Sequence, residues 1–330
     1  MSFSISCQRT FGCEFETVSS LTSPLTSAIH AVCDAYSIPY SSVYREAHLS
    51  AHCVRLPDGR VWKAERDGSL SHGGAEIVTP PLTTADLPMV RKVLYHLRQN
   101  GHTVDSSCGG HIHVGAADFD AASLRRLVNL FFSKQDLLTA SNGTQSDRLH
   151  GGYAEALDAR LIEALNKAKP DSLQKFAQIW YGNATWSSGW MPCERWLDHA
   201  EEHYCSARYR ALNLHPFFDP NRPNTVEFRF FEGTLDYSQV EANVLLALSM
   251  VEMAAASKSA SPKVAPTQQE NPRYAFRCFL LRLGFIGDEF TSARKVLLNR
   301  LLGDTAWLRG KDSYESYHAQ VANRRAQPTA

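Results

Sequence analysis

The sequence predicts an α+β fold in which short strands form a sheet and helices cover one of its faces. Short runs of alternating apolar and polar residues dominate the first half of the chain. Segments with helical periodicity lie between and after these runs. At 330 residues with 44% hydrophobic side chains, the chain is long enough to bury one large core around a continuous sheet.

The expected strands are bounded by turn residues. Two short runs flank the turn Pro57-Asp58-Gly59, and Pro80-Pro81 closes another run because proline cannot donate to a strand ladder. In chain order, we expect strands at 11–18, two within 52–64, and one each at 75–79, 108–114, about 207–214 and 225–231.

Helices are expected where apolar residues recur every three or four positions. Leu87, Val90 and Leu94 keep this spacing, and Gly101 is the expected stop. The expected helices are about 84–100, 119–140, 154–169, 171–181, 236–257 and 273–302.

The chain divides into three expected parts. A main domain covers 1–257 and contains a helical insertion at about 143–200. Residues 258–272 form a polar, proline-rich linker. A C-terminal helical segment and polar tail complete the chain over 273–330.

Charge and composition exclude several classes of protein. Thirty-four Lys and Arg balance thirty-four Asp and Glu, so no basic field is available for nucleic acid or an anionic membrane. The first ten residues lack a signal-peptide pattern, and we expect no membrane-spanning segment. Eight scattered cysteines without a CxxC motif favour free thiols. We therefore expect a cytoplasmic protein without nucleic-acid or membrane partners.

Polar residues occur in pairs at every second position inside otherwise apolar strands. The pairs are Glu14 and Glu16, His111 and His113, and Glu227 and Arg229. Successive side chains of a strand point to opposite faces, so both members of a pair share one face, about 6.5–7 Å apart. Charges on a sheet face are costly to bury unless they neutralise one another or bind a cation.

This set of side chains has the chemistry of a hard-cation site. Carboxylates in excess over imidazoles favour Mg²⁺ or Mn²⁺ rather than structural zinc, which prefers thiolates. Asp67 in a turn and Glu76 in the strand before Pro80-Pro81 are further candidate ligands. Two carboxylates about 7 Å apart on one strand can each lean on a different ion of a two-metal site.

The structural alternative is a solvated strand face. Any single Glu-x-Glu or His-x-His strand is more typical of such a face than of a metal site, because antiparallel sheets often have one wet side. Three strands with reactive residues at the same spacing favour function instead.

Six segments of the chain resemble a known family. They are FGCEFE (11–16), DGSL (67–70), AEIVTPPL (75–82), CGGHIHVG (108–115), YRALNL (209–214) and VEFRFFEGTLD (226–236). In this order they are similar to the amidoligase family, a branch of the carboxylate–amine ligases that includes glutamate–cysteine ligase and glutamine synthetase. The resemblance covers about 11–255 and makes 1–257 an amidoligase-like catalytic domain.

The resemblance implies a curved antiparallel sheet that forms a glutamine-synthetase-like catalytic funnel, with helices on its outer face. ATP enters one end, and two or more Mg²⁺ or Mn²⁺ ions lie between its phosphates and the substrate carboxylate. The positions that match metal ligands are Glu14, Glu16, Asp67, Glu76, His111 and Glu227. His113 matches a residue nearer the nucleotide, Arg229 one that contacts the transferring phosphoryl group, and Asn213 a positioning residue.

The implied reaction joins a small-molecule or peptide acid to an amine. ATP converts the carboxylate to an acyl phosphate, because a carboxylate is otherwise a poor electrophile. Glu232 is a candidate base for the amine by proximity alone. Gly110 departs from the family pattern, and we expect a close approach to the strand there.

The tryptophans of the insertion also lack a counterpart in the family. They are Trp180, Trp186, Trp190 and Trp196. Packing under a loop is the structural interpretation of this cluster, and a platform on the acceptor side of the site is the functional one.

Two other functions remain open. His199, Glu202 and His203 fit the H-x-x-E-H pattern of a zinc metallopeptidase, with Cys193 and Cys205 nearby as further candidates for a structural zinc site. A non-catalytic binding module on the same fold would lack part of the ligand set, but every acidic or histidine position that can be matched is filled.

Overall fold

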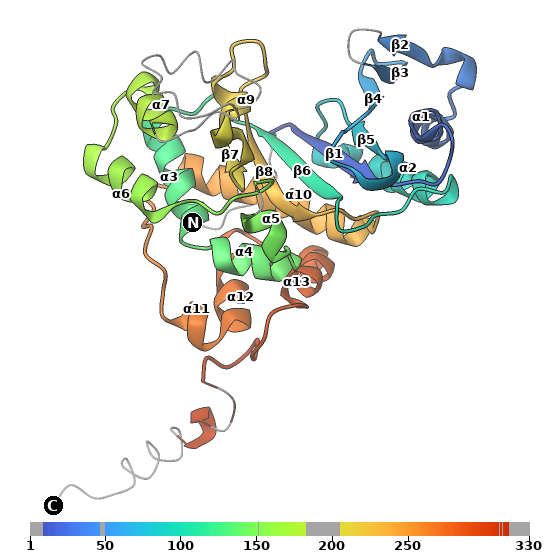
Figure 1. Cartoon of the computed structure of the whole chain (residues 1–330). Coiled ribbons are helices and arrows are strands. Elements are labelled where there is room, and N and C mark those ends of the chain that lie inside the picture. The colour runs from blue at the N-terminus through green and yellow to red at the C-terminus, as the bar shows by residue number, and fades with distance from the viewer. Residues whose placement is uncertain are drawn as a thin grey trace, which may run out of the picture.

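The computed structural model describes residues 9–46, 50–150, 152–182, 205–309, 311 and 313–316. Within this part of the chain the fold is α+β, as predicted, and is built on an eight-stranded sheet (Figure 1). Every paired strand is antiparallel to its neighbour, and the sheet runs in the order β2-β3-β4-β5-β1-β6-β8-β7. The sheet is open, because β2 and β7 form its two edges rather than pairing with each other.

The strands follow the predicted alternating runs. They are β1 (Phe11–Thr17), β2 (Tyr44–Glu46), β3 (Ala51–Arg55), β4 (Val61–Glu65), β5 (Ala75–Val78), β6 (Gly109–Gly115), β7 (Leu212–Asn213) and β8 (Thr225–Glu232). The short edge strand β2 was not predicted. The prediction of a strand over 207–214 is wrong for its first half, because Ser206–Tyr209 form a 3₁₀ turn and Tyr209 bonds to the backbone of Glu155. The segment joins the sheet only from Ala211, whose carbonyl accepts a hydrogen bond from the amide of Arg229.

The helices of the described chain include one long helix near the N-terminus and three short helices that the sequence pattern did not predict. They are α1 (Pro24–Tyr36), α2 (Leu87–Gln99), α3 (Ala121–Phe132), α4 (Gln135–Asn142), α5 (Ser146–His150), α6 (Ala159–Ala168), α7 (Leu173–Tyr181), α9 (His215–Phe218), α10 (Tyr237–Ala256), α11 (Thr267–Glu270), α12 (Pro272–Arg282) and α13 (Thr291–Leu298). Helix α1 was missed because its buried side includes small residues such as Ala28 and Ala31 rather than a leucine stripe.

The prediction of one helix over 119–140 is wrong, because the helix breaks between α3 and α4. Lys134 takes a non-helical conformation there, and its ammonium group lies 5.7 Å from the centre of the Phe279 ring. The backbone carbonyl of Ser133 accepts a hydrogen bond of 3.1 Å from the side chain of Gln268. The C-terminal segment therefore holds the break, through contacts that no local pattern contains.

The sheet has one apolar face and one polar face. On β1, Phe11, Cys13 and Phe15 are buried in the main hydrophobic core, while Glu14 and Glu16 alternate with them. Helix α1 packs against β3, β4 and β5, and α10 packs against β6. Figure 1 shows α10 running along the back of β6 and β8. Helical packing on the apolar face leaves the polar side chains to face the other way.

Helix α10 is a core helix. This helix of twenty residues is apolar and long enough on average to cross a membrane by length and composition alone, but 61% of its most apolar window is buried. Its first turn is capped by Asp236, whose carboxylate accepts a hydrogen bond from the amide of Ser238. The apolar length of this helix is thus used for packing against the sheet and against α3 and α13.

The C-terminal helices pack onto the same core as the sheet. Phe276 and Leu280 of α12 and Leu297 of α13 are buried in the hydrophobic cluster that also contains Phe11 and Phe228. Helix α11 begins at Thr267, inside the segment predicted as a linker. The boundaries predicted at 257 and 272 stay predictions, and most of the predicted tail lies outside the described residues.

Substitution of Phe131 tests how much packing on the apolar face of β8 contributes to the stability of the fold. Its ring is fully buried, 6.2 Å from the Phe228 ring and 5.6 Å from the Phe230 ring between centroids. We expect Phe131→Ala to lower the free energy of unfolding by about 3–5 kcal/mol, through lost burial and a residual cavity. Urea denaturation measures this. Tyr95→Ala is the control, because Tyr95 is 58% exposed and its loss should change stability by less than about 0.5 kcal/mol. Equal effects of the two substitutions would contradict the assignment of the apolar face.

Candidate functional site

Strand register gathers the predicted polar residues on one face of the sheet. The directly opposed residues are Glu14 with His111, Glu16 with Glu76, His113 with Glu227, and Asn213 with Glu227. Opposed residues of antiparallel strands share a face and stand within contact distance of each other. The i, i+2 pairs therefore meet across strands as well as along them.

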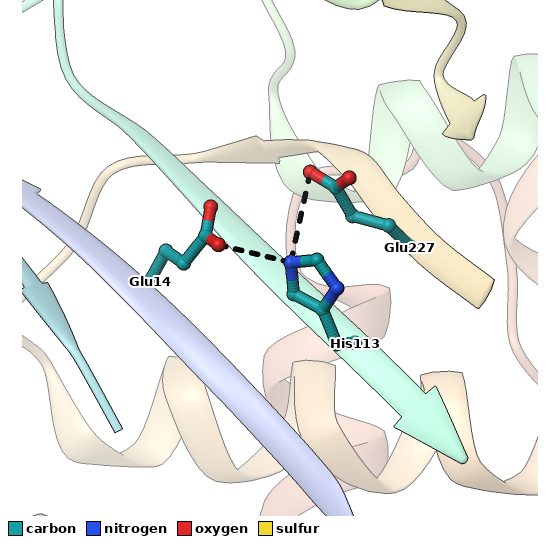
Figure 2. Close-up of side chains that lie close together, drawn as sticks. All are labelled: Glu14, His113 and Glu227. Carbon is teal, nitrogen blue, oxygen red and sulfur yellow. Dashed lines mark hydrogen bonds and ion pairs between the residues drawn. The ribbon is translucent and has the colours of Figure 1, made fainter. Parts of the chain in front are cut away.

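Glu14, His113 and Glu227 form the first group of candidate metal ligands. Figure 2 shows the two carboxylates on either side of the His113 ring, each from a different strand. His113 Nε2 lies 3.1 Å from Glu14 Oε1 and 3.9 Å from Glu227 Oε1. One ligand atom from each residue lies within 4.8 Å of the others, which is close enough for a single ion.

His111 links this group to the next residues along β1. Its Nδ1 lies 2.9 Å from Glu14 Oε2, and its Nε2 lies 3.6 Å from Glu16 Oε1. With Glu76, these residues form a second group, Glu14–Glu76–His111. Glu14 therefore belongs to two neighbouring groups, as a ligand shared between two ions would.

The third group is Glu16, Asp67 and Glu76, and it contains only carboxylates. Asp67 is held in its turn by the amide and hydroxyl of Ser69, which donate to Asp67 Oδ1 at 2.7 and 2.8 Å. Glu16 Oε2 accepts a hydrogen bond from the amide of Gly109. The turn at Asp67 thus places its carboxylate beside those of the strand residues Glu16 and Glu76.

Arg229 and Asn213 fix the position of Glu227. Arg229 Nη1 lies 2.5 Å from Glu227 Oε1, and Asn213 Nδ2 donates to Glu227 Oε2 at 2.7 Å. Asn213 Oδ1 in turn accepts from the amide of His215 at 2.7 Å. Both oxygens of Glu227 are therefore engaged, and Asn213 contacts Glu227 as a positioning residue would.

The β6–β8 side of the site compensates its own charges. Burial opposes ionisation of Glu14, but the neighbouring His113 and the hydrogen bonds from both histidines leave its pKa well below the usual range. Burial likewise opposes ionisation of Glu227, but Arg229 and His113 lower its pKa. Burial would lower the pKa of His113, but Glu227 and Glu14 raise it. These groups form an internally paired network.

The β5 side of the site lacks such compensation. Burial raises the pKa of Glu76 well above its usual range, and the charges of Glu14, Glu16 and Asp67 raise it further. None of the ion pairs in the described part of the chain joins Glu76 to a Lys, Arg or His. A cation at this position would relieve the repulsion, so the donor set fits a divalent metal with oxygen ligands.

Several pockets are lined by candidate site residues, including one of about 810 Å³ that reaches Asp67, and two of them together contain six of the nine residues. A pocket of about 570 Å³ includes Glu14 and His113, and its walls combine Val61, Val78 and several prolines with the cations Arg60, Lys63 and Arg222. A smaller pocket of about 190 Å³ includes Glu16, Asp67, His111 and Arg229. The candidate ligands therefore border a large, partly apolar space and a small polar one.

All nine predicted site residues lie in or against these groups. The sequence interpretation missed Lys63 and Glu65 of β4, although they show the same i, i+2 signal. Glu65 is opposed to Glu76 in the sheet, and Lys63 Nζ lies 3.1 Å from Glu46 Oε2 and 3.9 Å from Glu65 Oε1. It also missed Arg148 of α5, for which the sequence offers no periodic signal.

The expectation for Gly110 is wrong. A Cβ there would lie 3.5 Å from the Glu232 carbonyl oxygen, an ordinary contact. The close approach is at Gly109, where a Cβ would lie 2.2 Å from Arg148 Nη2. Glu232 lies outside the three groups, and its carboxylate accepts a hydrogen bond from the amide of Gln145 at 2.8 Å. The contacts of Glu232 give no support to its role as a base.

The zinc interpretation falls on residues that the structure does not describe. His199, Glu202, His203 and Cys193 lie outside the described ranges, and Cys205 is buried. Trp180 is fully buried and stacks on Phe176, with the Arg210 guanidinium 4.5 Å from its ring centre. The packing interpretation therefore holds for Trp180, while Trp186, Trp190 and Trp196 lie outside the described residues.

A family model described as "Putative amidoligase enzyme" matches residues 7–251. The chain belongs to this amidoligase family. The match spans the sheet, all nine site residues and most of α10, in agreement with the resemblance predicted over about 11–255. No curated protein matches the chain. Membership points to a ligase enzyme and gives no support to the metallopeptidase.

The unequal compensation of the two sides predicts opposite effects on stability. We expect Glu76→Gln to raise the melting temperature of the metal-free amidoligase at pH 7.5, because the substitution removes a crowded charge. We expect Glu227→Gln to lower stability by about 3–5 kcal/mol, since it breaks a buried pair with Arg229. Thermal and urea denaturation in EDTA measure the two effects, and the two substitutions control for each other.

The pH dependence gives a second readout of the same prediction. The pKa of Glu76 is higher in the folded protein than in the unfolded chain, so its stabilising contribution is present at acid pH and is lost as the pH rises through the folded value. The stability gap between Glu76→Gln and the wild type should open above about pH 4.3, the unfolded pKa of Glu, and widen with pH. A gap that closes with rising pH would contradict this assignment.

Proposed function

We propose that this amidoligase is an ATP-dependent carboxylate–amine ligase that acts through an acyl phosphate. The observation that carries the proposal is the chain of three adjoining ligand groups between a large pocket and a small one. Two substrates that meet at a metal-rich centre need this arrangement. The polar face of the open sheet would then serve as the wall of a glutamine-synthetase-like funnel.

The large pocket is the proposed ATP site. The apolar side chains Val61 and Val78 and the prolines offer a surface for a base, while Arg60, Lys63 and Arg222 offer cations for phosphates. Its volume of about 570 Å³ lies within the ordinary range of about 300–1,000 Å³ for small-molecule sites. His113 lines this pocket and also touches Glu14, which supports its predicted place between nucleotide and metal.

Six residues would hold Mg²⁺ or Mn²⁺, with His113 beside them: Glu14, Glu16, Asp67, Glu76, His111 and Glu227. Bound divalent cations supply charge neutralisation at the transferring phosphoryl group. The protein contributes the fixed spacing: β1, β5, β6 and β8 set the separations of the ligands before any substrate binds.

Arg229 is the proposed catalytic cation. It is only 8% exposed, it is held by Glu227 and by the Tyr153 carbonyl, and it lines the small pocket. In this position its guanidinium would bind the phosphoryl group as the group leaves ATP. Burial favours a strong interaction, because little water competes for the guanidinium. Asn213 supports Arg229 indirectly by orienting Glu227.

The two steps balance as follows. A carboxylate oxygen of the acid attacks the γ-phosphorus, and the bond from that phosphorus to the bridging oxygen of ADP breaks. A neutral amine then attacks the acyl carbon, the carbon–oxygen bond to phosphate breaks, and the nitrogen gives up one proton, which the released phosphate takes up. The products are ADP, phosphate and an amide, and the phosphate carries one oxygen from the acid.

The substrates are proposed to be a small-molecule or peptide acid and an amine. A cytoplasmic location fits this proposal, because Cys13, Cys33, Cys53, Cys108 and Cys278 are free thiols. Nucleic acid and membranes are not proposed as partners, in keeping with the balanced charge of the chain.

ATP binding is the first test of the proposal. We expect ATP with Mg²⁺ or Mn²⁺ to raise the melting temperature, because a ligand that binds only the folded state stabilises it by about 2.7 kcal/mol at a hundred times its Kd. ATP with EDTA should give a much smaller shift. Differential scanning fluorimetry measures both. No shift with either cation would rule out the ligase assignment.

Isotope transfer tests the proposed intermediate. With an acid labelled by ¹⁸O in its carboxylate and a competent amine, we expect one ¹⁸O atom in the released phosphate, measured by mass spectrometry. Arg229→Lys should slow the release of ADP by at least about tenfold, since the loss of one oriented donor at a phosphoryl or oxyanion site typically costs about 10²–10³ in rate. Release of AMP instead of ADP would refute the acyl-phosphate route.

A further inference from the structure

The small pocket is richer in cations than phosphoryl transfer requires. About 190 Å³ in volume, it is lined by three arginines, two tyrosines and two serines besides its candidate metal ligands. These residues are Arg148, Arg208, Arg229, Tyr153, Tyr209, Ser69 and Ser107. Arg229 already pairs with Glu227, so Arg148 and Arg208 are guanidinium groups to which the proposed reaction assigns no task.

Arg148 has the properties of a ligand-binding cation. The residue is only 7% exposed, and its Nε is buried without a hydrogen-bond partner. No carboxylate of the described residues lies within ion-pair distance of it. Burying a charge without a partner is costly. The pocket therefore contains a positive group that an anion would satisfy.

The backbone makes room for Arg148 beside the metal ligands. Gly109 begins β6, and a Cβ at this position would lie 2.2 Å from Arg148 Nη2 and 2.9 Å from its Cζ. The amide of the same Gly109 donates to Glu16. The guanidinium thus packs on the strand that borders the third ligand group. Arg148 and Asp67 both line the small pocket, whereas His113 lines the large one.

We propose that Arg148 and Arg208 bind a second carboxylate of the acid substrate, while the first carboxylate is activated beside Arg229. This inference depends on the proposed ligase function and specifies its substrate class: a small dicarboxylic acid or an acidic amino acid. The planar guanidinium fork matches a carboxylate with two parallel hydrogen bonds. The small volume admits a short acid rather than a nucleotide.

A second carboxylate has a chemical consequence for selectivity. An acid with only one carboxylate would leave Arg148 buried and unpaired. Because an unsatisfied buried polar group is costly, the site should bind this acid much more weakly than one with two carboxylates. Discrimination of this kind falls on the acid and leaves ATP binding unchanged, because the large pocket does not include Arg148.

The test compares acids that differ by one carboxylate. Melting temperatures of the full chain with Mg²⁺ are measured with succinate, glutarate and adipate against butyrate, valerate and hexanoate. L-Glutamate and L-aspartate are likewise compared with 4-aminobutyrate and β-alanine. We expect at least one diacid to bind at least tenfold more tightly than its partner with one carboxylate. Equal binding across every pair would overturn the proposal.

Substitution of Arg148 locates the effect. Arg148→Gln should abolish the preference for the diacid and leave the ATP-dependent shift intact, while Arg148→Lys should retain part of the preference. Arg98→Gln is the matched control, because Arg98 is exposed on α2 and should keep both responses. Loss of the ATP shift in Arg148→Gln, with the preference retained, would assign Arg148 to the nucleotide and overturn the proposal.

The shift in melting temperature caused by ATP distinguishes failure of the proposed ligase function from failure of the proposed second-carboxylate site. An ATP shift in the wild type without preference for diacids overturns the second-carboxylate site and leaves the ligase function standing. Absence of the ATP shift overturns the ligase function itself. If Arg148→Gln fails to fold, the paired acids on the wild type still decide the question.

Discussion

The crowding of carboxylates on one sheet face is the constraint on which the rest of this structure depends. Glu14, Glu16, Glu76 and Glu227 come from three strands whose other faces are sealed by the hydrophobic core. Because alternate side chains of a pleated strand lie on the same face, these carboxylates all project from the face opposite the core. The strands therefore hold the carboxylates together at fixed separations. The neighbouring residues differ in whether they neutralise this negative charge or add to it.

The negative charge is neutralised on one side of the site but not on the other. On the β6–β8 side, His113 and Arg229 neutralise Glu14 and Glu227 within the protein itself. On the β5 side, Glu76 faces carboxylates on both flanks. At one end of the face the carboxylates are therefore paired with a histidine and an arginine, and at the other end the carboxylate of Glu76 lies among other carboxylates. The two ends of the site therefore differ in charge.

The sequence predicted the parts of the site that depend on local periodicity. Alternation along β1, β6 and β8 was sufficient to assign a shared face to each polar pair, because the geometry of a strand is local. The register that brings Glu14 opposite His111 is not local, and only family resemblance indicated it. Lys63 and Glu65 were missed although their alternation is the same. Arg148 was beyond reach, because its position depends on a glycine thirty-nine positions earlier in the chain.

The packing of the C-terminal helices has a consequence for how the family boundary is understood. The matched region ends at residue 251, yet Gln268 and Phe279 hold the turn between α3 and α4, and α13 packs against α10. A fragment cut at the end of the match would leave the apolar sides of α4 and α10 uncovered. The family match is therefore shorter than the hydrophobic core, because residues beyond 251 pack into the same core as the matched region.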